Sequence, residues 1–574
     1  MLGRISIPNK RSLLADLVMI IGIGALLYSS FVFVGEWKSQ FNPSIHIDLS
    51  LSALPFYSLF SAMRGLGAYV ISLFFTLIVG YYAAKSPSAE KIILPALDIF
   101  QSIPVLGFLP GLVMGLVALF PHTNIGLELA ALLMIFTGQV WNMTFAFYSS
   151  LKSIPSDLKE AAQVMSLSKS SQFLRLELPF SAVNLVWNSI MSMAGGWFFL
   201  TVCESFTLGN QQYRLPGLGA YMATAIEEGN TQAMILGVIA MAFVIILLDL
   251  IIWRPALTWV QRYRLENIEG SPASEDHLLQ FIFKYSTVLR FFRIRLVQRH
   301  RQKIFKNSLP SFRPHFNFLP RIPIPQLKWL SYWFVGAALI GLSWGSFKLF
   351  HVLSTLSFDQ WGIILKGTAL TFARVCGSLI LATIWALPMG IWLSRKPKRL
   401  QIAQPLAQLF ASFPAPMLYP LVVGLSFQMG IRFSWSSMIL MLLGVQWYIL
   451  FNTLAGGLRI SHEIEDSMNL MQVSTWHKWK YLYIPSVFPA LVTGWITAAG
   501  GAWNASIVAE YLSYHNQILE TDGLGALISR SAGEANFSML TACLFVMVIF
   551  VILLNRFFWD RIYKISQTRF RLDF

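Results

Sequence analysis

Charged residues are scarce in this 574-residue sequence, at 12% of the chain, whereas hydrophobic residues make up 55%. A soluble domain carries about 25% charged residues, so this scarcity excludes an ordinary soluble protein. The apolar residues gather into runs of about 20, the length that an α-helix needs to span a bilayer. The sequence therefore predicts an all-α polytopic membrane protein.

Cysteine is also rare, and the thiols show no redox or metal-binding spacing. Cys203, Cys376 and Cys543 lie in or beside apolar runs, which is typical of buried small side chains. The chain also lacks a G-x-x-x-x-G-K-[ST] phosphate loop, an H-E-x-x-H pair and any Cys/His cluster. We therefore expect no ATP site, no metal site and no catalytic residue in this chain.

The apolar runs predict about twelve transmembrane helices, six in each half of the chain. We place them near residues 13–35, 56–83, 92–120, 127–149, 180–203 and 232–253, and then near 329–350, 362–394, 402–428, 434–456, 486–509 and 539–558. Lys and Arg are concentrated in alternate loops, so the positive-inside rule predicts that both termini and the join between the halves are cytoplasmic.

The join carries most of the basic excess of the chain. The formal net charge is +16, and residues 254–328 hold 14 Lys/Arg against 4 Asp/Glu. We expect a first unit at 1–265, a basic cytoplasmic linker at 266–328 and a second unit at 329–574. A linker helix lying on the anionic inner leaflet is favoured over nucleic-acid binding, so membrane lipids are the expected partner of the linker.

The two halves are copies of one another. Gly217-Leu218-Gly219-Ala220 recurs as Gly523-Leu524-Gly525-Ala526, and Trp253 recurs as Trp559, always 306 positions later. A constant offset over such a span indicates a fused tandem duplication. Six helices per copy preserve the orientation, so the repeats are expected to be parallel.

One polar stretch, residues 151–179, has the features of a docking surface for another protein. Pro155, Ser156 and Asp157 suit the first turn of a helix, because proline fits position N1, and Ser and Asp favour the positive end of the helix dipole. Two short helices with a face of small side chains would form a rigid projection. The alternative is an ordinary amphipathic loop, and the recurrence of the stretch at 457–485 counts against it.

In this stretch the chain resembles the permease subunits of binding-protein-dependent ABC importers. Their pattern is Glu-Ala-Ala, three residues, Gly, nine residues and Ile-x-Leu-Pro. The first copy has Glu160, Ala161 and Ala162, then Ser166 where the family has Gly, and Leu178 before Pro179. The second copy has Asp466 and Ser467, then Gln472, and Ile484 before Pro485, while a gap would instead place Glu465 at the acidic position.

Further residues resemble the nitrate/sulfonate/taurine/bicarbonate branch of that family. They are an arginine in the second helix of each unit, Arg64 and Arg374, and the prolines Pro104, Pro110, Pro414 and Pro420. These pairs are 310 positions apart. A four-residue difference therefore precedes the register of 306.

The same residues are candidates for a translocation path or gate. Mid-helix prolines bend helices, either to line a cavity or only to improve packing. The arginines either snorkel to the outer interface or form a cationic ring that attracts anions. Glu204 and Glu510 either border the gate or the binding-protein site or are solvated loop acids. Each follows a glycine and a tryptophan that are further candidates for the path: Gly195, Trp197, Gly501 and Trp503.

The resemblance implies a type I importer fold like that of the methionine and maltose importers, with two fused permease units in a bacterial inner membrane. It implies two separate ATPase subunits below, which bind ATP and Mg²⁺, and a substrate-binding protein above. By analogy with the branch, the solute would be a small anion such as nitrate, bicarbonate or an organosulfonate. The rival hypothesis is a stand-alone secondary transporter with parallel repeats, which needs acidic residues at the membrane midplane.

Overall fold

The computed structural model describes residues 33–260 except 40, 44, 103 and 210, and residues 336, 340, 341 and 343–570 except 515 and 516. The segments Ser30–Ser274 and Phe358–Phe574 form one compact unit. The expected linker at 266–328 lies outside the described residues, as do most of the expected helix at 13–35 and half of the expected helix at 329–350. The two sequence repeats therefore meet within a single unit.

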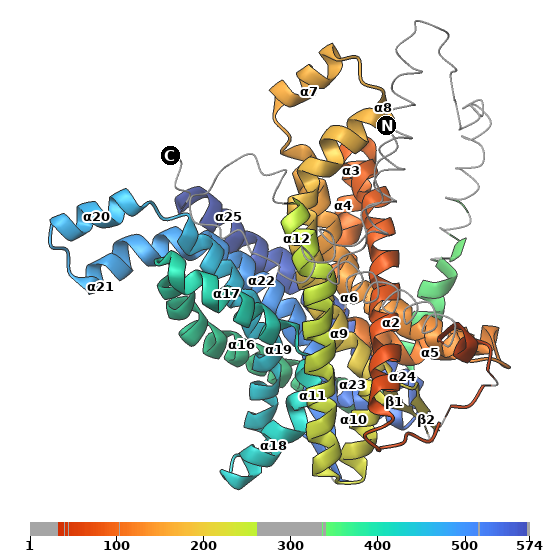
Figure 1. Ribbon diagram of the computed structural model, residues 1–574. Helices are drawn as coiled ribbons and strands as arrows, with labels where there is room; N and C mark the ends of the chain where they lie inside the picture. Colours follow the sequence, from red (N-terminus) through yellow and green to blue (C-terminus); the bar gives the residue numbers. More distant parts are fainter. Residues whose placement is uncertain are drawn as a thin grey trace, which may run out of the picture. The chain divides into compact units, whose positions relative to one another are not determined.

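The first repeat is a series of long helices joined by short surface segments (Figure 1). Its helices, its π-helical turns η1, η3 and η4, its 3-10 turn η2 and its strands are α2 (Leu54–Phe75), η1 (Thr76–Gly80), α3 (Tyr81–Lys85), α4 (Pro87–Ser102), η2 (Val105–Phe108), α5 (Leu109–Leu119), α6 (Ile125–Lys152), α7 (Ser156–Val164), α8 (Lys169–Gln172), η3 (Phe173–Glu177), α9 (Leu178–Cys203), β1 (Ser205–Leu208), β2 (Gln211–Arg214), α10 (Leu218–Glu227), α11 (Thr231–Leu248), η4 (Asp249–Trp253) and α12 (Arg254–Val260).

The second repeat follows the same order. Its elements are α16 (Phe358–Ser394), α17 (Pro397–Ser412), η6 (Ala415–Leu418), α18 (Tyr419–Gln428), α19 (Phe433–Leu458), α20 (His462–Leu470), α21 (Thr475–Lys478), η7 (Trp479–Tyr483), α22 (Ile484–Ala509), β3 (Tyr511–Tyr514), β4 (Gln517–Glu520), α23 (Leu524–Gly533), α24 (Phe537–Leu554), η8 (Asn555–Trp559) and α25 (Asp560–Arg569). From α7 to α12 every element starts 306 positions before its copy, whereas α4, η2 and α5 start 310 positions before theirs. The duplication is therefore confirmed element by element, and the offset changes between α5 and α6.

Local sequence explains several of these boundaries. Pro179 and Pro485 follow the π-helical turns η3 and η7 inside continuous helical stretches, and the missing N–H of a proline is compatible with such a local break in the regular hydrogen-bond ladder. The Asn230 side chain caps α11 by accepting a hydrogen bond from the Ala233 N–H at 3.0 Å. Its copy Asn536 caps α24 through the Met539 N–H at 3.1 Å. The duplication has therefore preserved capping chemistry as well as hydrophobic pattern.

Eight helical segments in the described part of the chain are long and apolar enough to cross a membrane, or nine if one bent pair counts as a span. They correspond to eight of the twelve expected helices. The expected helices at 92–120 and 402–428 are each broken in the middle instead, and in the second repeat the two pieces meet at 83°. Pro104 and Pro414 cause the break, because each has an extended ψ of 100° or 115° just before the 3-10 turn.

The long helix that begins each repeat carries a different irregularity in each copy. In the first repeat the π-helical turn η1 interrupts it at Thr76–Gly80. In the second repeat α16 contains Pro388, which occupies the position of Ile78 in η1. A π-helical turn and an internal proline both disturb the regular hydrogen-bond ladder.

The two repeats pack against each other through reciprocal contacts. Helix α11 contacts α17, and its copy α24 contacts α4; likewise α9 contacts η6, and its copy α22 contacts η2. At the end of the bundle that carries the hairpins, α10 contacts β3 and α23 contacts β1. Within each repeat, the largest packing surfaces join α6 to α9 and α19 to α22. This reciprocity is what a pseudo-twofold axis between two parallel repeats requires.

Candidate functional site

A cavity of about 370 Å³ lies where the two repeats meet. Its walls come from α4, η2, α6 and α9 of the first repeat and from α17, η6, α19, α22 and α24 of the second. Both copies of the broken helices thus contribute to it through their kinks: Val105 follows Pro104, and Phe413 and Ala415 flank Pro414. The prolines place backbone at the cavity but do not line it themselves.

Part of the wall is symmetric. Trp141 and its copy Trp447 both line the cavity. Each stacks nearly parallel on a phenylalanine of the neighbouring broken helix, at centroid distances of 6.0 Å to Phe100 and 6.4 Å to Phe410. The duplication has therefore kept the same tryptophan–phenylalanine stack beside the cavity in both repeats.

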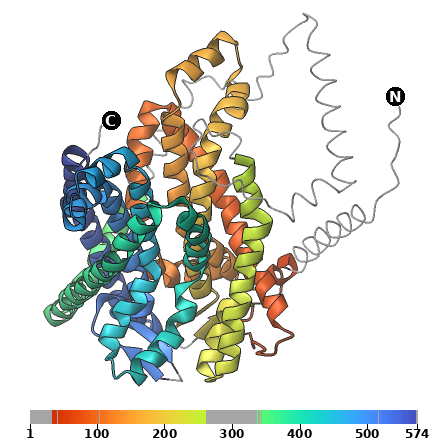
Figure 2. The ribbon, with the colours of Figure 1, turned by 60° about the vertical axis from the view of Figure 1, so that its left-hand side comes forward.

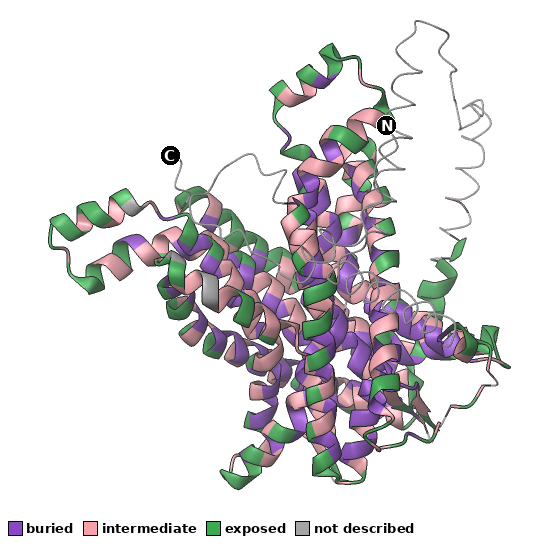
Figure 3. Ribbon diagram, in the orientation of Figure 1, coloured by how far each residue is buried: buried purple, intermediate pink, exposed green. Residues whose placement is uncertain are grey.

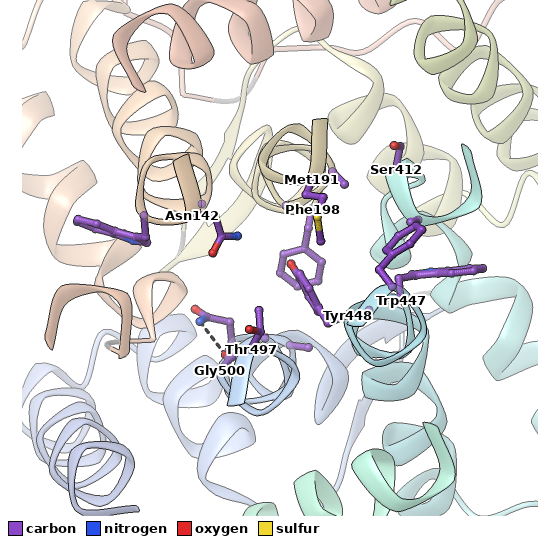
Figure 4. A pocket seen from close by; sticks show the side chains of 18 of the residues that line it. Asn142, Met191, Phe198, Ser412, Trp447, Tyr448, Thr497 and Gly500 are labelled. Carbon is purple, nitrogen blue, oxygen red and sulfur yellow. Dashed lines mark hydrogen bonds between the residues drawn. The ribbon is translucent and has the colours of Figure 1, made fainter. Parts of the chain in front are cut away.

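The rest of the wall is asymmetric (Figure 4). The first repeat contributes Met191 and Phe198 from α9, whereas their copies on α22 are Thr497 and Asn504. On the preceding helices the polarity is reversed, because Asn142 of α6 corresponds to Tyr448 of α19. The cavity consequently has one side rich in hydroxyl and amide groups and another side rich in aromatic and thioether groups.

Asn504 also joins the two repeats. Its Oδ1 accepts a hydrogen bond from the Val105 N–H at 2.8 Å, and its Nδ2 donates to the Gly500 carbonyl at 3.2 Å. Its copy Phe198 cannot make such bonds. The broken helix of the first repeat is thus tied to α22 by a bond that the other side of the axis lacks.

Gly195 and Gly501 are the predicted path residues that the structure brings to the cavity wall. A Cβ at Gly195 would lie 3.1 Å from the Gly138 carbonyl oxygen and 3.8 Å from the Tyr448 hydroxyl. A Cβ at Gly501 would lie 3.5 Å from the Tyr448 ring. Both glycines therefore leave room for Tyr448 between the helices of the two repeats.

The cavity has little charge. Among the described residues that line it, Asp98 is the only acidic or basic side chain. Hydrogen-bond donors are provided instead by Asn142, Thr497 and other neutral side chains. No group of three or more His, Cys, Asp or Glu in the described part of the chain is arranged to hold a metal ion.

Arg64 lies away from the cavity, in a buried ion network of the first repeat. Its Nη2 donates to Glu128 Oε1 at 2.7 Å and its Nη1 donates to Glu204 Oε1 at 2.8 Å and to the Pro216 carbonyl at 2.7 Å. Arg64 is 0% exposed, and Glu204 also accepts hydrogen bonds from Ser61 and from the Gly219 N–H. For this repeat we therefore reject three predictions: an outer cationic ring, an arginine that snorkels to the interface, and a solvated glutamate. The buried charges pair with one another inside the protein.

Arg374 and Glu510 form the corresponding network in the second repeat. Arg374 Nη1 donates to Glu510 Oε1 at 2.7 Å, and Nη2 donates to Thr521 at 2.9 Å and Ser434 at 3.3 Å. Glu510 also accepts from Thr371, the copy of Ser61, at 2.8 Å. Arg374 and Glu510 are buried as well, so they contribute to neither an outer ring nor a solvated loop.

The two candidate tryptophans are packing residues. Trp197 is 2% exposed and its ring lies against Gly65, where an added Cβ would meet it at 3.3 Å. Trp503 is 1% exposed and packs at 5.5 Å, centroid to centroid, on Phe550. Neither lines the cavity, and Pro110 and Pro420 lie buried in the first turns of α5 and α18.

The stretches around Glu160 and Asp466 form matching helix pairs. The pairs α7–α8 and α20–α21 project beyond the long helices that carry them (Figures 1 and 2). Their surfaces are largely exposed, as Figure 3 shows, and Glu160 and Ala161 point outward whereas Ala162 is buried. The turn between the two helices has a positive φ in both copies, 49° at Ser166 and 54° at Gln472. This geometry explains why glycine suits that position.

The structure also decides the register of the second copy. Helix α20 begins 306 positions after α7, so Asp466 and Ser467 correspond to Glu160 and Ala161 without a gap. Glu465 does not take the acidic position, because its carboxylate pairs with Arg395 and accepts a hydrogen bond from the Tyr483 hydroxyl at 2.6 Å. Leu178 and Ile484 begin the long helices α9 and α22 at equivalent places.

An ion pair from the end of the first long helix reaches η3 in the first repeat and the helix pair itself in the second. In the first repeat Lys85, at the end of α3, pairs with Glu177 of η3. In the second, Arg395 occupies the position of Lys85 but pairs with Glu465 of α20. Tyr483 replaces Glu177 there and binds the same glutamate. Both repeats thus have a basic residue at this position, but its carboxylate partner lies in η3 in the first repeat and in α20 in the second.

Glu128 and both hairpins were not foreseen from the sequence. A glutamate among apolar residues of a membrane helix is itself a signal of a buried ion pair or a functional site, and Glu128 is 1% exposed. The hairpins β1–β2 and β3–β4 are antiparallel pairs of four-residue strands. Such short strands leave too little alternation to be recognised.

The comparisons with known proteins agree with this architecture. The family model "Binding-protein-dependent transport system inner membrane component" matches residues 76–253 and 381–572, more than half of the chain. Bicarbonate transport system permease protein CmpB of Synechococcus elongatus is 25% identical over 139 residues, which are 24% of this chain and 46% of that protein. Nitrate import permease protein NrtB of Leptolyngbya laminosa is 23% identical over 158 residues, covering 28% of this chain and 52% of that protein.

The chain is also similar to a further curated permease and to a solved transporter structure. Putative ABC transporter permease protein MJ0413 of Methanocaldococcus jannaschii is 24% identical over 195 residues, covering 34% of this chain and 70% of that protein. The solved inward-facing methionine ABC transporter MetNI aligns with 37% of this chain and 99% of its own, with 18% identity and a TM-score of 0.31. The chain spans about half the length of the bicarbonate and nitrate relatives that it matches.

Proposed function

Since the chain belongs to the family of binding-protein-dependent transport system inner membrane components, we propose that its two repeats enclose the path by which an ABC importer moves a small anion across the bacterial inner membrane. The observation that carries this proposal is the pair of projecting helix pairs, α7–α8 and α20–α21, which recur with the same length, turn and exposure. Two equivalent projections suit two ATPase subunits. A stand-alone secondary transporter has no use for them.

The ATPase subunits would dock on these helix pairs at the cytoplasmic face. Glu160, Ala161 and Ala162 with Ser166, and Asp466 and Ser467 with Gln472, are the expected contact regions. The chain would hydrolyse no ATP itself, and ATP and Mg²⁺ would be bound by the partners. The ion pairs Lys85–Glu177 and Arg395–Glu465 would couple the movement of each projecting region to the end of the first long helix of its repeat.

A substrate-binding protein would deliver the solute at the opposite face, where the hairpins lie. The names of the bicarbonate and nitrate relatives favour a small inorganic anion. Inside the cavity such an anion would be held by neutral donors such as Asn142 and Thr497, because no Lys, Arg or His lines the described wall. Weak binding of this kind suits a path, since the solute must also leave.

Transport by the reconstituted complex tests the proposal. The chain with its co-purified ATPase, in liposomes that contain the binding protein, should take up ¹⁵N-nitrate or ¹³C-bicarbonate only when ATP is supplied to the ATPase side. Chloride, supplied in place of the test anions, is the control for leakage. Uptake by the lone chain under an ion gradient would instead support the secondary-transporter hypothesis.

The orientation has its own test. Ser170 of α8 and Gln212 of β2 lie at opposite ends of α9, and both are exposed. In intact cells a membrane-impermeant thiol reagent should label Gln212→Cys and leave Ser170→Cys unlabelled. The opposite pattern would place the helix pairs outside the cell, where no ATPase could reach them.

A further inference from the structure

One repeated position in the wall of the central cavity has a polar side chain in both copies. Asn142 of α6 and Tyr448 of α19 lie 306 positions apart, and both line the cavity. Neither side chain makes a hydrogen bond within the described part of the chain, and the polar atoms of both are accessible from the cavity. Figure 4 shows both side chains directed into the open space. This position can therefore offer hydrogen bonds to a solute from both repeats.

The other polar side chains that α6, α9, α19 and α22 contribute to the wall are already engaged. Thr137 donates to the Met134 carbonyl at 2.6 Å, and Asn504 uses both ends of its amide. Thr497 donates to the Thr493 carbonyl at 3.1 Å, so it can serve a solute only by giving up this bond. Apart from tryptophan indoles, the described wall residues of these helices thus leave two polar side chains ready for a solute, and both occupy the repeated position.

Tyr448 reaches from the second repeat to the first. A Cβ built on Gly195 of α9 would lie 3.8 Å from the tyrosine hydroxyl, and one built on Gly501 of α22 would lie 3.5 Å from the ring. Asn142 is shorter, and no atom of it comes within 4 Å of a Cβ built on Gly501. The hydroxyl of Tyr448 therefore lies beside the wall of the opposite repeat, where a solute passing between the repeats would meet it.

The chemistry of this pair suits an oxyanion. A tyrosine hydroxyl and an asparagine amide can both donate hydrogen bonds, and a hydrogen bond to an ionised acceptor is roughly twice as strong as one between neutral groups. Neither Asn142 nor Tyr448 carries a positive charge that would hold the anion as an ion pair. The binding that they provide is selective and still weak enough for release, as a path requires.

Resting on the proposed function, we propose that Tyr448 and Asn142 are the specificity-determining residues of the path. The Tyr448 hydroxyl and the Asn142 amide N–H donate hydrogen bonds to an oxyanion as it passes between the repeats. Each repeat contributes one donor from the same position of the duplicated fold. The two donors differ in length and chemistry, so the path treats the solute asymmetrically although the helices around it are symmetric.

Site-specific ¹⁹F NMR tests whether the anion reaches Tyr448. With 3-fluorotyrosine at position 448 alone, the chain is assembled with its ATPase in nanodiscs and titrated with sodium nitrate at constant ionic strength. The ¹⁹F resonance should shift and then saturate. The same label at Tyr563, an exposed residue of α25 outside the cavity, is the control and should not show a saturable shift. A resonance at position 448 that drifts without saturation would overturn the proposal.

Tyr448→Phe tests the hydroxyl while it keeps the ring between the helices. It should lower the rate of ATP-driven nitrate uptake about tenfold, because a hydrogen bond to a charged solute is lost. ATP hydrolysis in the absence of nitrate should stay unchanged. Asn142→Leu, which removes the amide at similar size, should lower uptake in the same way, whereas Tyr563→Phe should leave it unchanged.

The outcomes separate this inference from the function on which it rests. Absence of ATP-driven uptake by the wild type would contradict the proposed function. A wild type that transports nitrate, together with unchanged uptake in Tyr448→Phe, would overturn this inference alone. Loss of basal ATP hydrolysis in Tyr448→Phe would also overturn it, because the hydroxyl would then act on the assembly of the complex and not on the solute.

Discussion

The ion networks of the two repeats begin from the same arginine and the same glutamate but balance their charge differently. In the first repeat Arg64 meets two carboxylates, Glu128 and Glu204. In the second, Arg374 meets Glu510 alone, because the copy of Glu128 is Ser434. After duplication, one repeat has thus kept a network with one cation and two anions, and the other a balanced pair supported by hydroxyl groups.

The arginine of each repeat therefore neutralises a different number of buried carboxylates. Taking away Arg64 would leave two carboxylates buried without a counter-charge. Taking away Arg374 would leave one carboxylate, which still accepts hydrogen bonds from Thr371 and from the Gly525 N–H at 2.9 Å. Breaking a buried pair by removing one partner costs about 3–5 kcal/mol, and the asymmetry decides where in this range each repeat falls.

The largest expected effect follows directly. Arg64→Met should lower the free energy of unfolding by about 5 kcal/mol and Arg374→Met by about 3 kcal/mol. Unfolding of both variants in mixed micelles, followed by tryptophan fluorescence, would measure the difference. Equal losses would contradict the difference between the two networks.

The next effect concerns the two helix pairs. Ala161→Arg places a long charged side chain on the exposed face of α7, and it should reduce transport per ATP hydrolysed by roughly tenfold, equivalent to about 1.4 kcal/mol of lost docking or coupling energy. Ser467→Arg should do less, because the second copy already has bulky neighbours at Met468 and Trp476. Substrate-stimulated ATP hydrolysis and transport are both measured in reconstituted complexes.

Both outcomes of that comparison are informative. Equal uncoupling in the two variants would contradict the asymmetry while keeping the docking role. Full coupling in both would contradict the docking role itself. Ser170→Arg, on the adjacent helix α8, tests whether charge anywhere on the projection has the same effect.

A smaller effect is expected when the two ion networks are made alike. Glu128→Ser gives the first repeat the composition of the second, and it should cost about 1–2 kcal/mol, because hydrogen bonds to Arg64 are lost while a surplus buried carboxylate is removed. Combined with Arg64→Met, it should cost less than the sum of the two changes. A double-mutant cycle on unfolding free energies measures this coupling, and strict additivity would be the contrary result.

The smallest expected effect is a gain in stability at the turn of each helix pair. Ser166→Gly and Gln472→Gly keep the left-handed backbone conformation of the turn but remove the side chain that strains it, so each should add about 0.5–1 kcal/mol to the free energy of unfolding. Ser170→Gly, in a helical position of the neighbouring α8, is the matched control and should lose up to about 1 kcal/mol. Thermal unfolding of the three variants would show whether the two turn variants gain stability while the control variant loses it.

The duplication, the order of the helices and the projecting helix pairs could be predicted from the sequence. Constant offsets and apolar runs are local, one-dimensional signals, and Pro155 and Ser168 determine where α7 and α8 begin through their own chemistry. The sequence predicted bends at four prolines and left open whether they line a cavity, whereas the structure breaks the helices at Pro104 and Pro414 and places Pro110 and Pro420 in the first turns that follow. In the structure, residues beside the kinks line the cavity, whereas Pro104 and Pro414 themselves do not.

The fate of the charged and aromatic candidates could not be predicted, because it depends on partners far away in the sequence. Arg64 is neutralised by Glu128 and Glu204, which are 64 and 140 residues away. Trp141 lines the cavity whereas Trp197 is packed inside one repeat, and no local feature distinguishes them. A sequence can show that a charged residue lies in a membrane helix, but only the fold shows which residue of opposite charge pairs with it.

The first long helix of each repeat carries a local irregularity at equivalent positions. The first copy has a π-helical turn at Thr76–Gly80, and the second has Pro388 inside the continuous helix α16. A π-helical turn adds a residue to one turn, whereas a proline removes a hydrogen-bond donor, so neither replaces the other residue by residue. Exchanging the two segments between the copies would therefore change the length of the helix as well as its hydrogen bonding.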